Sequence, residues 1–517
     1  MADLFGLSDV SSLTESTAGI TSSPVLDTGD LRRRYNFGTR VSELAIAQDP
    51  FFRLLSKVAK RPVDDPEFKF SERRPSYHKR YAYVTNHGAT APASGAGGDA
   101  TVAAGAVDAG DTYHFVMGTD YKSAGNVGQI YGQTNAALQI GASGTQPQFL
   151  LPDQLIKVPY GASSASYSGG LIDAVSDYLV ARIVTVDSST VSNYVVIKTV
   201  IVKGTSAAIE LASYYAANNA SDGQDLSSMK IATELEPKRS YVVGSAHAQG
   251  SGYPETWKDQ PFSTGNGLTQ IWKTSLAMNN TTRATSLKYE PNEWARIWRE
   301  KLIEHKWDIE TSLLFGTQYT DGNSVQYTQG AVDYITSYGN IFDGSGMGGT
   351  GAKAQDDFLD DMSQFLDPRY NNANATLFFV STDVYNWLHK LSGYFSANII
   401  KVGKGNDGSS TELGRGNFSM GESRSAFGVA ITSVVTPYGS MNVARNVHLD
   451  GTNIKMLGIN MRYCAYRPLV GNSLNRDTAI YVGVQTLENS GVDRRVDLIQ
   501  TEAGMEWQMP EAHAVWK

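Results

Sequence analysis

The sequence predicts an α+β protein built around one long helix, with a β-rich module inserted into the chain. Three observations carry this prediction. Apolar residues recur at helical spacing between Pro291 and Phe315. Two runs rich in β-branched residues, 178–186 and 194–202, flank a short polar connection, which is typical of neighbouring antiparallel strands. A buried strand at 377–380 precedes a capped helix, a unit typical of mixed α/β domains.

Composition limits the classes of protein that remain. The 517 residues carry a net charge of −8, only 19% are charged and 41% are hydrophobic. No window approaches the roughly 18 consecutive apolar residues of a membrane-spanning helix, and residues 1–30 lack a basic start and an apolar stretch. The single cysteine, Cys464, excludes an intramolecular disulfide. We therefore expect a soluble protein of a reducing compartment that hides surface against partner subunits.

The N-terminal part is predicted to be an arm, a short helix and a strand. Asp49 and Pro50 suit the N-cap and the first position of a helix, and the charged–aromatic alternation of 67–70 predicts a strand with one wet face. From 31 to 80 the net charge is +7, which leaves −15 for the remainder. The arginines of this segment either neutralise nucleic-acid phosphates or pair with acidic patches on neighbouring subunits, and the second interpretation is favoured.

The composition changes at about residue 86. Between 88 and 110, 15 of 23 residues are Gly or Ala, which is too little bulk to pack a core. The two strand-forming runs follow within the same region. We therefore place an inserted β-rich module at 86–250.

The strongest single element is a helix predicted at 291–315. Pro291 is placed at its start and Gly316 at its end. At about 1.5 Å per residue it forms a rod roughly 37 Å long, which is typical of a scaffold spine. Its apolar stripe consists of Trp294, Ile297, Trp298, Leu302, Ile309 and Leu313.

The remainder combines helices and strands. A helix is predicted at 356–366, ended by Pro368, and Ser381 or Thr382 is expected to cap the helix after strand 377–380. The last third is mainly strands, at 429–435, 443–449, 454–459, 479–485 and 497–502.

Motifs with catalytic potential are weak. Asp27-Thr28-Gly29 spells the aspartic-protease triplet, but that chemistry needs two carboxylates and the sequence has no second copy. The glycines of 344–349 match a dinucleotide-binding pattern, but no convincing parallel strand is predicted before them. Ala352 stands where a phosphate-binding loop needs lysine. We interpret both motifs as turns or loops.

Histidine and cysteine patterns are equally uninformative. His305 falls within the long helix and is expected to pack or to face solvent, and Cys464 is interpreted as a small buried hydrophobe. The sequence therefore predicts no catalytic residue, no cofactor-binding residue, no metal ligand and no cofactor, and hence no enzyme. The eight histidines, none of them at metal-ligand spacing, are His78, His87, His114, His247, His305, His389, His448 and His513.

The order of elements resembles a known family. The arm leads into 49–55 and the strand at 67–70, an extended segment at 255–272 precedes the long helix, and 445–469 and 493–507 close the chain. This succession resembles the major capsid proteins of tailed double-stranded DNA bacteriophages, whose fold is named after phage HK97. The resemblance covers about 31–85 and 255–517, and the inserted module is a departure from it.

The resemblance implies a tile that assembles with sister copies. Hexamers and pentamers would form an icosahedral shell around the packaged double-stranded DNA, in a virion assembled in the host cytoplasm. Other implied partners are a scaffolding protein, a portal and a decoration or cement protein, with non-specific interior contact to DNA and no membrane. The implied parts are an N-terminal arm at 1–66, an extended loop at 67–85 and 251–288, the module at 86–250, a peripheral domain at 289–366 and 471–517 that carries the spine helix, and an axial domain at 367–470.

Two other functions stay open on the residues alone. The content of Gly, Ser and Tyr suggests a β-rich phage tail or adhesin structural protein, although adhesins typically lack so long a helix followed by an α/β unit. A nucleotide-binding enzyme would use the glycine loop at 344–353.

Overall fold

The computed structural model describes much of the chain from residue 49 onward. Residues 1–48 of the predicted N-terminal arm lie outside the described residues, as do residues 94–100 and 103–106 of the Gly/Ala-rich stretch at 88–110. The described residues are 49–73, 80–93, 101–102, 107–119, 146–162, 167–168, 171–172, 177–191, 193–204, 209–211, 239–255, 262–286, 292–348, 353, 355–366, 376–391, 419–426 and 429–517.

A five-stranded sheet covered by the long helix forms the first part, here called the peripheral part. Its strands follow the order β1-β12-β25-β21, and β24 also pairs with β25. The two longest strands, β12 and β25, pair antiparallel over 269–279 of β12. The bounds are β1 Glu67–Glu72, β12 Ser263–Asn279, α4 Glu293–Phe315, β21 Cys464–Pro468, β24 Ala479–Gln485 and β25 Arg494–Trp507.

Helix α4 confirms the predicted spine, with a start two residues later than expected. Asn292 is its N-cap, because the Asn292 side chain accepts a hydrogen bond from the Ala295 N–H at 3.2 Å. Pro291 lies outside the described residues. The helix ends at Phe315 as predicted, and the Gly316 N–H donates to the Ser312 carbonyl.

A mixed seven-stranded sheet forms the second part, here called the axial part. Its order is β15-β26-β20-β16-β19-β18-β17. Helices α6 and α7 pack on it, since Phe358 of α6 and Val384 of α7 share a buried cluster with Phe378 of β16. The bounds are β15 Asn340–Phe342, α6 Gln355–Phe365, β16 Thr376–Val380, α7 Thr382–Leu391, β17 Ser419–Ala426, β18 Val429–Thr436, β19 Gly439–Arg445, β20 Met456–Asn460 and β26 Ala514–Trp516.

Local predictions in this part hold to within about one or two residues, with one exception. The Ser381 hydroxyl accepts a hydrogen bond from the Val384 N–H and so caps α7 as expected. The strand predicted at 443–449 is wrong in its second half, because β19 ends at Arg445 and the 3-10 helix η9 Val447–Leu449 follows. The Asn446 side chain accepts from the His448 N–H at 2.9 Å and turns the chain there.

The inserted module is a β structure with a core of its own. Six antiparallel strands follow one another in the order β11-β2-β4-β9-β8-β5, and pairing of β5 with β11 closes the ring. The predicted pair of strands at 178–186 and 194–202 is confirmed as β8 and β9. The bounds are β2 Tyr81–Gly88, β3 Thr101–Val102, β4 Thr112–Gly118, β5 Gln154–Ala162, β8 Asp177–Asp187, β9 Val195–Lys203, β10 Ile209–Leu211 and β11 Ser240–Ser245.

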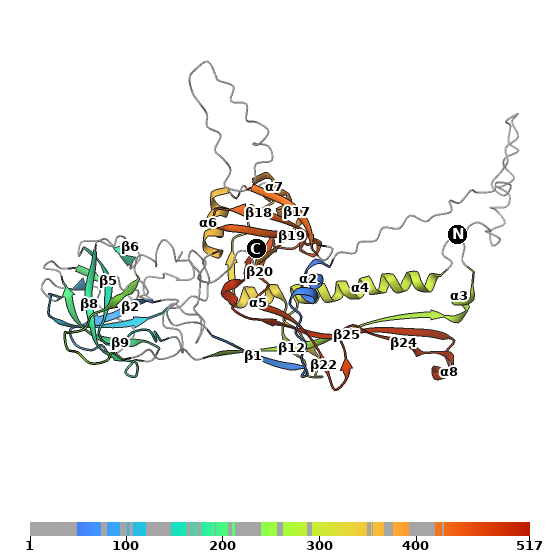
Figure 1. Cartoon of the computed structure of the whole chain (residues 1–517), viewed down its shortest axis with the longest axis horizontal. Helices are drawn as coiled ribbons and strands as arrows, with labels where there is room; N and C mark the ends of the chain where they lie inside the picture. Colours follow the sequence, from blue (N-terminus) through green and yellow to red (C-terminus); the bar gives the residue numbers. More distant parts are fainter. Residues whose placement is uncertain are drawn as a thin grey trace, which may run out of the picture.

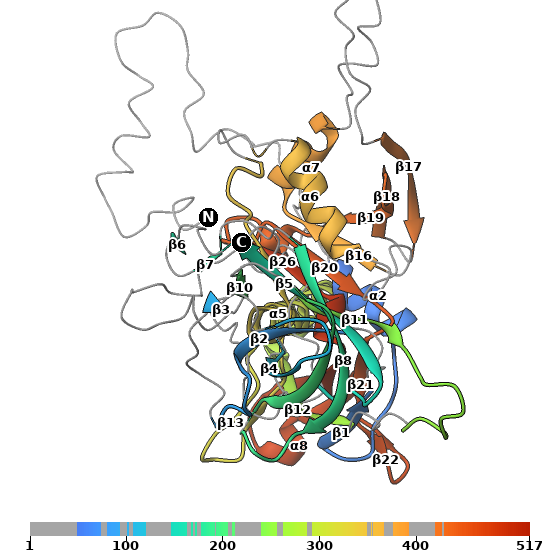
Figure 2. The ribbon, with the colours of Figure 1, turned by 90° about the vertical axis from the view of Figure 1, so that its left-hand side faces the viewer.

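The three parts form an elongated molecule (Figure 1). The module lies at one end, β1 and the start of β12 lead to it, and α4 with β24 and β25 extends to the other end. The axial part stands over the middle. Seen from the module's end, the strands of the closed sheet curve around one another (Figure 2).

Strand pairing moves several of the predicted domain boundaries. The boundary at 86 falls inside β2, which belongs to the sheet of the module. Strand β21, expected in the axial domain, pairs with β25 of the peripheral sheet. Conversely β15, α6 and β26, expected in the peripheral domain, belong to the axial part. The reason is that these partners are distant in sequence, and a local pattern does not reveal which sheet a strand joins.

Short elements complete the fold and connect the larger ones. They are α2 Pro50–Val58, β6 Tyr167–Ser168, β7 Leu171–Ile172, α3 Asn280–Ala284, β13 Tyr319–Thr320, β14 Gln326–Tyr327, α5 Ala331–Tyr338, β22 Val470–Gly471, β23 Leu474–Asn475, α8 Leu487–Ser490 and η10 Pro510–Ala512.

Candidate assembly surface

The far end of the peripheral part exposes a row of apolar side chains, here called the apolar tip. Strand β24 pairs with β25 on one side, and among the described residues no strand pairs with its other edge. Val482 is 64% exposed, the most of the row. The apolar tip consists of Ile480, Tyr481, Val482, Val484, Leu487 and Val492.

Such a surface is unfavourable for an isolated chain. A contiguous exposed apolar patch marks an interaction site, and an unpaired strand edge offers backbone N–H and C=O groups to another chain. At about 25 cal/mol per Å² of apolar area removed from water, covering the tip would stabilise a complex. The apolar tip is therefore suited to contact another protein.

The spine helix is buried along only one of its halves. His305, Ile309, Leu313 and Leu314 of the second half are fully buried. In the first half the predicted core residue Trp298 is only half-buried, and its indole N–H donates to Asp497 at 3.2 Å. The first half of α4 lies toward the apolar tip (Figure 1), and its side chains are less buried than those of the second half.

Strands β1 and β12, which lead to the module, are held to β25 by the ring of Phe68, which packs over Gly267 and Gly504. Phe68 of β1 is 6% exposed. A Cβ on Gly267 would lie 2.4 Å from the Phe68 ring, and one on Gly504 would lie 2.4 Å from the Leu268 carbonyl oxygen. The Arg467 guanidinium lies 5.6 Å from the centre of the same ring. The absence of side chains at these glycines lets β1, β12 and β25 approach closely.

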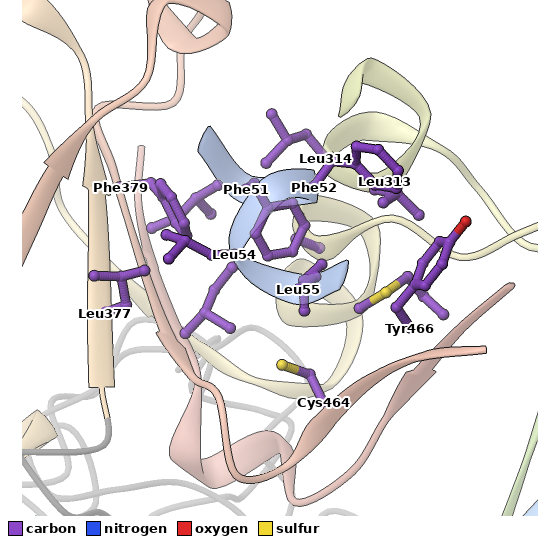
Figure 3. Packing of buried hydrophobic residues seen from close by; sticks show 14 of the residues in the cluster. Phe51, Phe52, Leu54, Leu55, Leu313, Leu314, Leu377, Phe379, Cys464 and Tyr466 are labelled. Atoms are coloured by element: carbon purple, nitrogen blue, oxygen red, sulfur yellow. The ribbon is translucent and has the colours of Figure 1, made fainter. Parts of the chain in front are cut away.

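Helix α2 joins the peripheral and axial parts. Asp49 occupies its N-cap position and Pro50 its first turn, as predicted. Phe51 packs edge-on against Phe379 of the axial sheet, with ring centres 5.3 Å apart, and Phe52 packs edge-on against Tyr466 of the peripheral sheet, at 5.5 Å. Figure 3 shows this helix between the two sheets and the end of α4. Its apolar face therefore holds the two parts together.

The basic segment at 31–80 is only partly described. Arg53 pairs with Asp49, and Lys60 pairs with Asp477 of the same chain. The residues of the Arg32–Arg34 cluster and Arg40 lie outside the described residues. Which of the two interpretations of this segment holds thus stays a prediction.

The glycine loop at 344–353 is occupied by contacts within the chain. The strand before it, β15, pairs in parallel with β26, so the expectation that no parallel strand precedes the loop is wrong. However, the Gly344 N–H donates to the Lys517 carbonyl at 2.9 Å, and the Lys353 ammonium donates to the Asp343 carbonyl and to Asp361. A phosphate would have to displace these partners, which favours the interpretation as a structural loop.

Cys464 and His305, two other candidates that the structure describes, are packed inside the chain. Cys464 is buried, and burial raises the pKa of its thiol to about 12, so it stays protonated as a small hydrophobe. His305 is fully buried between the hydroxyls of Thr274 and Thr501, at 2.9 and 2.8 Å. Within the described residues no group of three or more His, Cys, Asp or Glu side chains could hold a metal ion. Asp27-Thr28-Gly29 and His78 lie outside them.

Membrane insertion through a helix also finds no support in the described part of the chain. None of its helices combines the length and the apolarity needed to cross a bilayer.

An exposed apolar strand edge and two sheets held together by α2, without an assembled catalytic site among the described residues, are typical of a structural protein that assembles with other subunits. The family model of the SU10 major capsid protein matches residues 38–517. The chain therefore belongs to this family of major capsid proteins, which confirms the predicted function class, a structural subunit of a viral shell. No curated protein matches the chain.

Similar solved structures are phage capsids. The capsid of Myoviridae phage XM1 is 12% identical with a TM-score of 0.34, and it covers 52% of this chain and 80% of that one. The cyanophage A-1(L) capsid is 11% identical with a TM-score of 0.36, covering 53% and 84%. The Gordonia phage Cozz structure is 13% identical with a TM-score of 0.33, covering 53% and 77%. Membership of the family rests on the family match and not on these likenesses.

Two features of the structure, one exposed and one buried, were missed in the sequence. The run 479–484 is continuous and apolar, which is typical of a buried strand, so its exposure could not be predicted. Glu310 lies four residues before Leu314 on the buried side of α4. A charge within an apolar stripe is the signal that could have identified it as a buried contact.

Proposed function

We propose that the chain is the tile of an icosahedral phage head with an HK97-type fold, arranged as hexamers and pentamers around double-stranded DNA. The family match to a major capsid protein supports the shell, and the order of α2, extended strands, spine helix and α/β part supports the fold type. Assembly would take place in the host cytoplasm, with scaffolding, portal and decoration proteins as further partners.

The observation that most directly supports assembly through sister copies is the apolar tip. Its side chains stay exposed in the single chain although they would gain from burial. A shell subunit is held by several neighbours at once, so even a modest contact at each tip adds avidity. The tip therefore supplies an assembly contact that the free subunit lacks.

The interior surface of such a shell would meet DNA without sequence readout. The net charge of −8 on the whole chain keeps the overall attraction to a polyanion weak. Non-specific phosphate contacts would come from local basic groups and would weaken with salt. We also propose that the protein has no catalytic activity, in line with its family of structural proteins.

Electron microscopy of the expressed full chain tests the proposal. Closed hollow particles are expected from the wild-type chain with a scaffolding factor supplied. The double variant Val482→Asp with Val484→Asp should fold but lose at least about tenfold of its particle yield, because two carboxylates would have to be buried in the contact.

The double variant Val202→Asp with Val243→Asp is the matched control, since both are strand valines of the module and each is 53% exposed. Particle formation by the control but not by the tip variant supports the role of the tip. Wild-type chains that stay monomeric or form open trimers would contradict the proposed shell.

A further inference from the structure

A buried carboxylate of the spine helix contacts the beginning of α2. Glu310 is fully buried. One of its oxygens, Oε2, accepts the Phe52 N–H at 2.6 Å, and the other, Oε1, accepts the Phe51 N–H at 3.1 Å. Oε1 also accepts the side-chain amide of Asn446 at 2.8 Å. Glu310 thus joins three elements that are far apart in sequence: α2, α4 and the end of β19.

The two backbone donors are those that a helix start leaves unpaired. The first N–H groups of a helix lack intrahelical partners, and the Asp49 side chain at the N-cap of α2 makes no capping hydrogen bond. Its carboxylate instead binds the Arg53 guanidinium. The capping acceptor is therefore supplied from another helix, 258 residues along the chain from Phe52.

Two opposing effects act on the pKa of the Glu310 carboxyl group. Burial raises the pKa of Glu310 to about 7, against the opposing effect of the N–H donors of Phe51, Phe52 and Asn446. A charged group is retained inside a protein when its hydrogen bonds are complete. All three donors here point at the same carboxylate, so an acceptor-only side chain fits this position.

We propose that Glu310 is a positioning residue for α2, the helix within the predicted N-terminal arm at 1–66. Its carboxylate holds the start of α2 against the spine and the axial sheet, and so anchors the point where residues 1–48 join the rest of the chain. That this arm then contacts sister subunits rests on the proposed function, whereas the anchoring itself does not.

The variant Glu310→Gln keeps the size of the side chain and removes one acceptor. Its NH₂ group would face either the Phe52 N–H or the other two donors, which leaves buried donors unpaired. Opening of α2 should therefore become about tenfold more frequent or greater. Limited trypsin digestion measures this opening as cleavage after Arg53 and Lys57, relative to Arg283 in α3.

Two further variants separate anchoring from a general loss of stability. Glu304→Gln makes the same change on an exposed position of the same helix, and wild-type cleavage is expected. Asn446→Ala removes the third donor but leaves the contact between Glu310 and α2. It should therefore lower the melting temperature without increasing trypsin cleavage after Arg53. The proposal would be overturned if Glu310→Gln and the wild type were cleaved in α2 at the same rate. It would also be overturned if α2 of Asn446→Ala were cleaved as fast as α2 of Glu310→Gln.

Hydrogen exchange on the wild-type chain gives an answer even if Glu310→Gln fails to fold. The amides of Phe51 and Phe52 should be protected at least about tenfold more than is usual for a first helical turn. Rapid exchange of these two amides would also overturn the proposal. Both measurements work on unassembled subunits, so failure of the anchoring and failure of shell formation give different results.

Discussion

The module and the apolar tip lie at opposite ends of the molecule and treat their strand edges differently (Figure 1). In the module, pairing of β5 with β11 closes the sheet around a core that includes Phe115, Ile156 and Leu179. At the tip, β24 leaves one edge open and several apolar side chains exposed. The comparison teaches that the six strands at one end pair with one another in a closed ring around their own core, whereas the strand edge at the other end is left open for a partner.

The largest expected effect tests the independence of the module. Phe115→Ala should destabilise the module by about 3–5 kcal/mol, the usual range for removing a fully buried aromatic side chain. Because the core of the module shares no residue with the other clusters of the described part, the tip and the spine should keep their structure. Hydrogen exchange resolved by region measures this, and loss of protection in α4 would break the comparison.

Acid should affect the peripheral and axial parts through buried histidines. Burial lowers the pKa of His305 and of His513 to about 4, from the ordinary 6.5. Both histidines are neutral in the folded chain, so the unfolded chain takes up protons first as the pH falls below about 6.5. Their contribution to stability is therefore complete above pH 6.5 and is lost as the pH falls toward 4.

The contribution of Glu310 to stability changes with pH in the opposite direction to that of the two histidines. Its raised pKa, about 7, means that its contribution is complete below pH 4.5 and is lost as the pH rises through 7. Melting temperatures between pH 7.5 and 4.5 measure the combined effect of His305, His513 and Glu310 on stability. His305→Gln should reduce the loss on the acid side, whereas His247→Gln, on a module residue paired with Asp153, serves as the control. An acid slope unchanged by His305→Gln would contradict this assignment.

The smallest expected effect concerns the spine. Because Trp298 is only half-buried, Trp298→Ala should cost about 1–2 kcal/mol in the free subunit, which is less than for a core tryptophan. Chemical denaturation measures the free-subunit value. A clearly larger loss in assembled particles would sharpen the comparison, since it would place the first half of α4 in a contact between copies.

Prediction from the sequence succeeded where the pattern is local. The length of α4 follows from apolar residues at helical spacing and a glycine after Phe315, and the pairing of β8 with β9 follows from two similar runs joined by a short turn. The predicted domain bounds differ from the observed sheets at β2, β21 and β26, because the partners of these strands are distant in the chain. The role of Glu310 was missed for the same reason.

By itself the sequence determined the spine helix, the β-rich character of the module, the order of elements that resembles a capsid protein and the absence of disulfides within the chain. Only the tertiary structure decided that the module closes on itself, that β24 is exposed and that Glu310 caps a helix from afar. The physical reason is the distance along the chain between the residues that interact. Helix and hairpin formation depend on neighbours a few residues away, whereas closure, exposure and long-range capping depend on which distant surfaces meet.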